Sequence, residues 1–124
     1  MKIEVSNGEI VDKLTIIELK LKYIQDKAKR KNLKTEYEVL DKAVAQIIAK
    51  DHKLYQELLS INQELWDIED TIRDLERQKD FGEKFIETAR AVYFTNDRRS
   101  EVKKKINELT GSQLIEEKSY QKYD

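Results

Sequence analysis

Four consecutive polar residues near the C-terminal end of the chain, Asn96-Asp97-Arg98-Arg99, interrupt an otherwise apolar helical pattern. Asn96 and Arg99 are three residues apart, so they share one face of a helix. A buried arginine on that face must meet a carboxylate, either of the protein or of a bound anion. The segment therefore predicts one of three arrangements: an ion pair with an acid on a neighbouring helix, a kink that faces solvent, or a pocket for an anionic ligand.

The single tryptophan, Trp66, opens a second candidate segment, Trp66-Asp67-Ile68-Glu69-Asp70. Helical spacing places Asn62, Trp66, Glu69 and Arg73 on one mixed face beside an apolar one. A tryptophan with acids alongside can line a pocket. We favour the alternative, in which Trp66 is a large residue at the edge of the core or of a dimer interface and its N–H finds a partner. The candidate binding residues of this segment are Trp66, Glu69 and Asp70.

Charged residues also flank the N-terminal helix. Glu9 and Lys13 are four residues apart in the order that favours an ion pair along one helix. Most such charges are expected to be solvated, and the candidate binding residues here are Glu9, Asp12 and Lys13. The basic segments 27–34 and 98–105 could contact phosphates or an acidic partner, but we favour pairing with the acidic segment 64–76 and solvation.

These residues must be positioned by helices, because the chain has no proline and only three glycines among 124 residues. Ser6 and Glu9 fit a capping box at the start of the first helix. Its apolar residues then recur every three or four positions. They are Ile10, Leu14, Ile17, Leu21 and Ile24.

Three further helices follow from the same periodicity. A second apolar pattern runs from Leu33 to Ile47, and the charge of Asp51 at the next apolar position predicts a break near residues 49–52, with His52 in an exposed turn. One continuous helix through this point is the alternative. The third helix is expected over residues 52–79 and the fourth ends at Thr110-Gly111. The third keeps a heptad pattern through Leu54, Leu58, Ile61, Leu65, Ile68, Ile72 and Leu75.

Four amphipathic helices must bury their apolar faces against one another. We therefore predict an all-α protein, an antiparallel bundle of about four helices with a long, heptad-patterned third helix. Residues 1–111 form the domain, and residues 112–124 form a polar tail that is either docked or partly disordered. The apolar surface exceeds what one small bundle hides, which favours a homodimer.

Composition excludes several classes of protein. Lys plus Arg number 24 and Asp plus Glu number 25, so the formal net charge of −1 gives no general attraction to nucleic acid. The chain has no cysteine and one histidine, so we expect no cofactor and no metal site. No apolar run is long enough to span a membrane or to act as a secretion signal. A cytoplasmic location is the expectation.

Several motifs resemble a domain of unknown function found in small bacterial and phage proteins. They are Ser-x-Gly-Glu-x-x-Asp-Lys-x-Thr-Ile at residues 6–16, Leu-Trp-x-Ile-Glu-Asp at 65–70, Thr-Asn-Asp-Arg-Arg at 95–99 and the tail segment 116–120. The resemblance implies an association with glycosyltransferases for surface polysaccharide. The resemblance adds weight to Ser6, Glu9, Asp12, Lys13, Thr15, Trp66, Glu69, Asp70, Asn96, Asp97, Arg98 and Arg99, and to Glu117, Lys118 and Tyr120 in the tail.

The resulting hypothesis is a non-catalytic helical binding or scaffold protein, an accessory to surface-glycan biosynthesis with a partner such as a glycosyltransferase. The alternative is a small helical enzyme or a binding module for an anionic metabolite, similar to chorismate mutases or to nucleotide-sugar-binding proteins. Such a site needs Arg and Lys to hold carboxylates. Convergence of Lys13, Glu69 and Arg99 on an open pocket would favour the alternative.

Overall fold

The computed structural model describes residues 1–114, and this part of the chain folds into four α-helices without a strand. The helices are α1 (Asn7–Tyr23), α2 (Lys27–Ala45), α3 (Lys53–Arg77) and α4 (Glu83–Thr110). The predicted all-helical class is confirmed. None of these helices combines the length and the apolar character that a membrane crossing requires.

Local residues explain where each helix begins and ends. The Ser6 hydroxyl accepts a hydrogen bond from Glu9 N at 3.3 Å and caps α1. The break between α2 and α3 is confirmed, and it spans residues 46–52 because α2 already ends at Ala45. His52 caps α3, since its Nδ1 accepts a hydrogen bond from Leu54 N at 3.0 Å. The prediction that His52 is an exposed turn residue was wrong, because its side chain is half-buried. Gly111 ends α4 with a φ of 67°.

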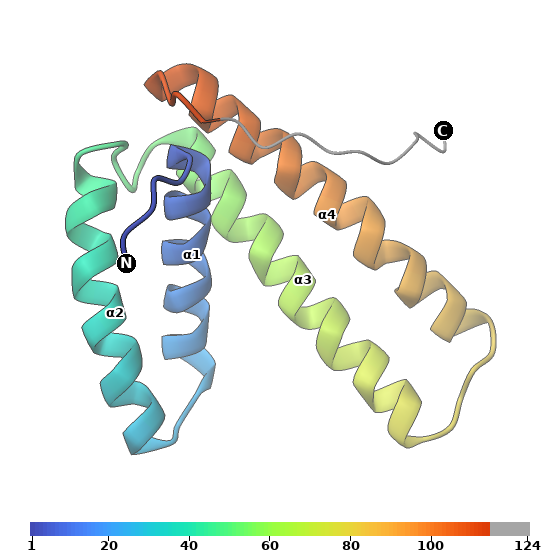
Figure 1. Ribbon diagram of the computed structural model, residues 1–124. Helices are drawn as coiled ribbons and strands as arrows, with labels where there is room; N and C mark the ends of the chain where they lie inside the picture. Colours follow the sequence, from blue (N-terminus) through green and yellow to red (C-terminus); the bar gives the residue numbers. More distant parts are fainter. Residues whose placement is uncertain (115–124) are drawn as a thin grey trace.

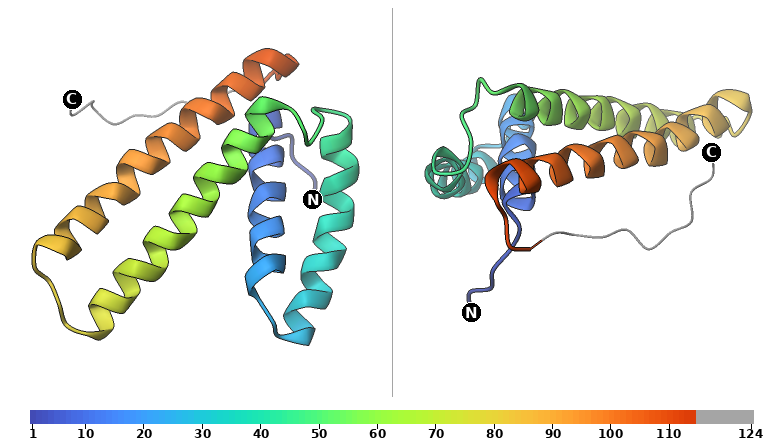
Figure 2. Two further views of the ribbon diagram at one scale, coloured as in Figure 1. Left: turned by 180° about the vertical axis from the view of Figure 1, so that it is seen from behind. Right: turned by 90° about the horizontal axis from the view of Figure 1, so that it is seen from above.

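The four helices form two hairpins that meet at one end and diverge at the other (Figures 1 and 2). Helix α1 packs against α2 on one side and against both α3 and α4 on the other, while α2 approaches only α1 closely. The far ends of α3 and α4 extend away from α1 and α2 as a two-helix arm. The molecule is therefore more open than a closed four-helix bundle.

The apolar core lies where the two hairpins meet. Its buried side chains come from all four helices and from the turn after α2. Burying such side chains stabilises the fold by about 1.5–3 kcal/mol each, before the loss of chain entropy is counted. The core residues are Val11, Leu14, Val44, Ile48, Tyr55, Leu58, Ile61, Val102 and Ile106.

Candidate functional site

The first turn of α1 lies directly on α4. Gly8 N donates a hydrogen bond to Asn107 Oδ1 at 2.6 Å. A side chain at Gly8 would place its Cβ 2.5 Å from the backbone oxygen of Lys103, closer than any real contact. The glycine therefore allows the two backbones to approach. The contact continues beyond the C-terminal end of α4, where Asn7 N donates to Ser112 Oγ at 3.1 Å.

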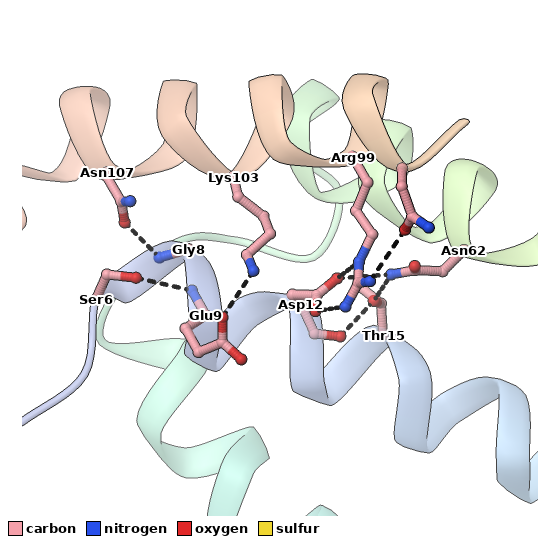
Figure 3. Close-up of polar contacts among 10 residues, drawn as sticks. Ser6, Gly8, Glu9, Asp12, Thr15, Asn62, Arg99, Lys103 and Asn107 are labelled. Atoms are coloured by element: carbon pink, nitrogen blue, oxygen red, sulfur yellow. Dashed lines mark hydrogen bonds and ion pairs between the residues drawn. The ribbon is translucent and has the colours of Figure 1, made fainter. Parts of the chain in front are cut away.

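Glu9 belongs to this contact between helices. Its carboxylate accepts from Lys103 Nζ at 2.7 Å (Figure 3). The predicted pair of Glu9 with Lys13 along α1 was wrong, because Lys13 lies 4.0 Å from Glu36 of α2 on an exposed surface. Lys13 therefore faces α2, whereas Glu9 faces α4.

Asp12 is the centre of a buried polar network between α1, α3 and α4 (Figure 3). It is 1% exposed, and both of its carboxylate oxygens contact the Arg99 guanidinium, Oδ1 at 2.9 Å from Nε and Oδ2 from Nη2. Asn62 Nδ2 donates to Asp12 Oδ1 at 2.9 Å and to Thr15 Oγ1 at 2.8 Å. A bidentate pair with satisfied neighbours is the arrangement that makes buried charge tolerable.

The segment containing Arg99 is an uninterrupted part of α4. Asn96 Oδ1 accepts from Arg99 Nη1 at 3.4 Å and helps to orient the guanidinium. Arg98 points to the other side of the helix and pairs with Glu64 of α3 at 3.0 Å, where both side chains are about half exposed. Asp97 is half-buried. Adjacent arginines thus contact different helices.

Trp66 lies beside this network and is held by the end of α1. Its ring stacks on Tyr23, with 5.0 Å between the ring centroids and 21° between the planes. The Tyr23 hydroxyl donates to Gln63 Oε1 at 3.0 Å, which fixes the stacked ring. One face of the indole is covered by Tyr23, and Trp66 also lines a neighbouring pocket.

An open pocket of about 300 Å³ adjoins Trp66 and the Asp12 network. Helix α1 supplies two apolar side chains to the pocket, α3 supplies both apolar and polar side chains, and α4 supplies Arg99. The pocket brings together four of the predicted candidates, Trp66, Glu69, Asp70 and Arg99. Its lining residues are Ile16, Leu19, Asn62, Leu65, Trp66, Glu69, Asp70, Arg73 and Arg99.

The charges around the pocket are nearly balanced. Arg99 is paired with Asp12, and Arg73 lies 3.5 Å from Glu69. Asp70 has no ion pair among residues 1–114. Two guanidinium groups thus stand against three carboxylates, Asp12 included, which leaves a formal charge of −1. An anionic ligand would gain no net electrostatic attraction here.

A second polar cluster links α1 to α2, to the start of α3 and to the turn between α2 and α3. The Tyr55 hydroxyl donates to Glu18 Oε1 at 2.8 Å, and Lys50 Nζ lies 3.6 Å from Glu18 and 2.6 Å from Asp41. Burial, followed by the hydrogen bond to Glu18, raises the pKa of Tyr55 well above its usual range.

Within residues 1–114, no group of three or more metal-ligating side chains is placed to hold a metal ion.

The structure separates the three residues whose convergence would have favoured an anion site. Glu69 and Arg99 line one pocket, but Lys13 lines another with Asn32 and Glu36. The predicted candidates Glu117, Lys118 and Tyr120 lie outside the described residues. Lys103 and Asn107 were not among the predicted candidates, although both continue the spacing of four residues that begins at Arg99.

Comparison with known proteins gives one family. A search of curated proteins and a search of solved structures returned no match for the chain. The sequence model of a family of unknown function, DUF6165, matches residues 1–123. Because the match spans nearly the whole chain, the protein belongs to this family of unknown function.

Proposed function

We propose that the protein is a non-catalytic helical binding protein that acts in the cytoplasm as an accessory to surface-glycan biosynthesis, with the pocket beside Trp66 as a sugar-binding site. The observation that carries the proposal is the combination of an indole with polar groups of both charges around one open pocket. Association with a glycosyltransferase is part of the proposal and rests on the family resemblance of the motifs.

The chemistry of the pocket fits a sugar ring. A pyranose presents C–H groups on its faces, which pack on an indole, and hydroxyls around its rim, which both donate and accept hydrogen bonds. Carboxylates of Glu69 and Asp70 accept from such hydroxyls, and the Arg73 guanidinium donates to them. The volume of about 300 Å³ lies at the small end of ligand pockets, which suits one or two sugar rings.

The alternative, an enzyme or binding module for an anionic metabolite, is supported less well. Arg99 is neutralised by an aspartate that is 1% exposed, so binding an anion there would compete with a buried ion pair. Lys13 faces α2 rather than this pocket. The charged motif residues Glu9, Asp12 and Arg99 are therefore better explained as contacts between helices. This leaves Glu69 and Asp70 of the pocket wall to recognise a neutral ligand.

Titration of Trp66 fluorescence with neutral monosaccharides and their nucleotide diphosphate derivatives tests the proposal, since Trp66 is the single tryptophan. We expect saturable binding of at least one neutral sugar, and weakening of that binding by about tenfold in Asp70→Asn, which loses a charged hydrogen-bond acceptor. Asp74→Asn is the matched control, because Asp74 is exposed on the same helix but does not line the pocket.

Two outcomes would contradict the proposal. One is an absence of any saturable response to neutral sugars. The other is tighter binding of dianionic ligands with no effect of Asp70→Asn, which would favour the anion-binding alternative.

A further inference from the structure

The face of the α3–α4 hairpin that receives α1 continues beyond the end of α1. On α4, this face is marked by Arg99, Lys103 and Asn107, which contact α1 and are four residues apart. The repeat of three or four residues that keeps side chains on one helix face, continued towards the start of α4, leads to the apolar side chains of Val92, Ala89 and Phe85. The surface of the α3–α4 hairpin that contacts α1 is therefore continuous with the same face of the arm, which we call the inner face.

Nothing in the described part of the chain covers the distal part of this surface. Helix α1 ends at Tyr23, whose ring reaches only to Trp66 in the middle of α3. Between residues 67 and 94, Leu75 is the one buried side chain, while Ile86 is 56% and Phe81 is 52% exposed. Two helices alone cannot bury the side chains along their common seam, so a further layer is required. The half-buried apolar residues of this seam are Ile68, Ile72, Phe85, Ala89 and Val92.

We propose that this layer is the arm of a second copy of the chain, packed face to face around a two-fold axis near Ala89. Such a contact covers both arms at once and turns two exposed hairpins into a four-helix layer. The two arms must run antiparallel. Helix α1 occupies the inner end of each face, so parallel arms would bring the two copies of α1 into collision.

The sequence of the arm is self-complementary about this axis. Ile86 and Tyr93 lie almost equally far on either side of Ala89, so each exposed apolar residue meets the other across the dimer. The Arg98–Glu64 pair sets the register between α3 and α4 and places Arg73 level with Ala89. Glu69 and Arg77 lie four residues before and after Arg73, so Glu69 of one chain faces Arg77 of the other. The two copies of Arg73 meet at the axis, and each is neutralised by Glu69 of its own chain, 3.5 Å away.

The dimer also completes the pocket. In the antiparallel register, the tip of one arm reaches the base of the other, at the level of Leu65 and Trp66. Phe81 at the tip, which packs edge-on against Phe85, would then lie at the mouth of the neighbouring pocket. This inference uses the pocket of the proposed function but does not depend on its ligand being a sugar.

Light scattering coupled to size-exclusion chromatography tests the association. At micromolar concentration we expect a mass of twice 14.8 kDa. Ile86→Glu, which buries a charge at the interface, should weaken dimerisation by about tenfold or more and shift the emission of Trp66 to longer wavelength. Val39→Glu is the matched control, because Val39 is an exposed apolar residue on α2 and should leave the dimer intact.

Cysteine crosslinking tests the position of the axis, since the chain has no cysteine of its own. Mild oxidation should convert Ala89→Cys to a disulfide-linked dimer, because a disulfide needs Cα atoms within about 7 Å. Ala28→Cys, exposed on α2, should not crosslink at the same concentration. A monomeric wild-type chain, or equal crosslinking of the two variants, would overturn the proposal. A dimer without sugar affinity would contradict only the proposed function.

Discussion

Arg98 and Arg99 show how differently two adjacent residues of one type can act. The Arg99 side chain is 27% exposed and pairs with Asp12, whose side chain is 2% exposed, whereas the side chains of Arg98 and Glu64 are 55% and 47% exposed. A buried carboxylate cannot replace its partner with water, but an exposed one can. The two pairs therefore differ in their contribution to stability although their side chains are alike.

This difference gives a prediction for single substitutions. Arg99→Ala leaves Asp12 buried without a counter-charge and should lower the free energy of unfolding by about 3 kcal/mol. Arg98→Ala, the matched control, should lower it by less than about 1 kcal/mol. Urea denaturation followed by circular dichroism measures both values. Equal losses would show that the Asp12–Arg99 pair does not stabilise the fold.

At the scale of helices, local patterns predicted the ends well. Ser6 and Gly111 are found at the ends where their chemistry placed them, because caps and left-handed residues act within a few positions of chain. The partner of Glu9 was not predictable in this way. Its carboxylate meets Lys103, which is distant in sequence, and a capping-box pattern carries no information about a competing tertiary partner.

The candidate site was predicted only in part, because local spacing groups the residues of one helix but does not identify their partners on other helices. Helical spacing grouped Trp66, Glu69 and Arg73, and the structure places all three at one pocket. The contributions of Ile16 and Leu19 could not be foreseen, because periodicity identifies an apolar face but not the helix against which it packs. The pairing of Arg99 with Asp12, rather than with another acid, depends on that same packing.

The contact between α1 and α4 leads to a prediction for Gly8. Gly8→Ala would place Cβ 2.5 Å from the backbone oxygen of Lys103, which can move only if the helices separate. We expect a loss of about 1–3 kcal/mol in the free energy of unfolding. Gly82→Ala is the control, because its nearest contact is 3.4 Å from a side-chain atom, and should cost about 0.5 kcal/mol or less. Thermal and urea denaturation distinguish the two, and a stable Gly8→Ala variant would argue against the close helix contact.

At the scale of the whole molecule, we expect polar contacts to set the angle between the two hairpins. The apolar core joins them near one end, and the ion pairs Asp12–Arg99 and Glu9–Lys103 lie along the line on which α1 meets α4. Apolar packing is tolerant of small rotations, whereas a bidentate pair has a narrow geometry. The ion pairs are therefore expected to fix the angle between the hairpins and hence the direction of the arm.

The most direct test of this central claim is the distance between the hairpins in solution. Spin labels on Lys34→Cys of α2 and Glu87→Cys of α4, both exposed, allow pulsed electron spin resonance to measure that distance, and excess unlabelled protein removes contributions between chains. We predict one narrow distance distribution, which broadens when Arg99→Met is added. A broad distribution with Arg99 present, or an unchanged width after its replacement, would contradict the account.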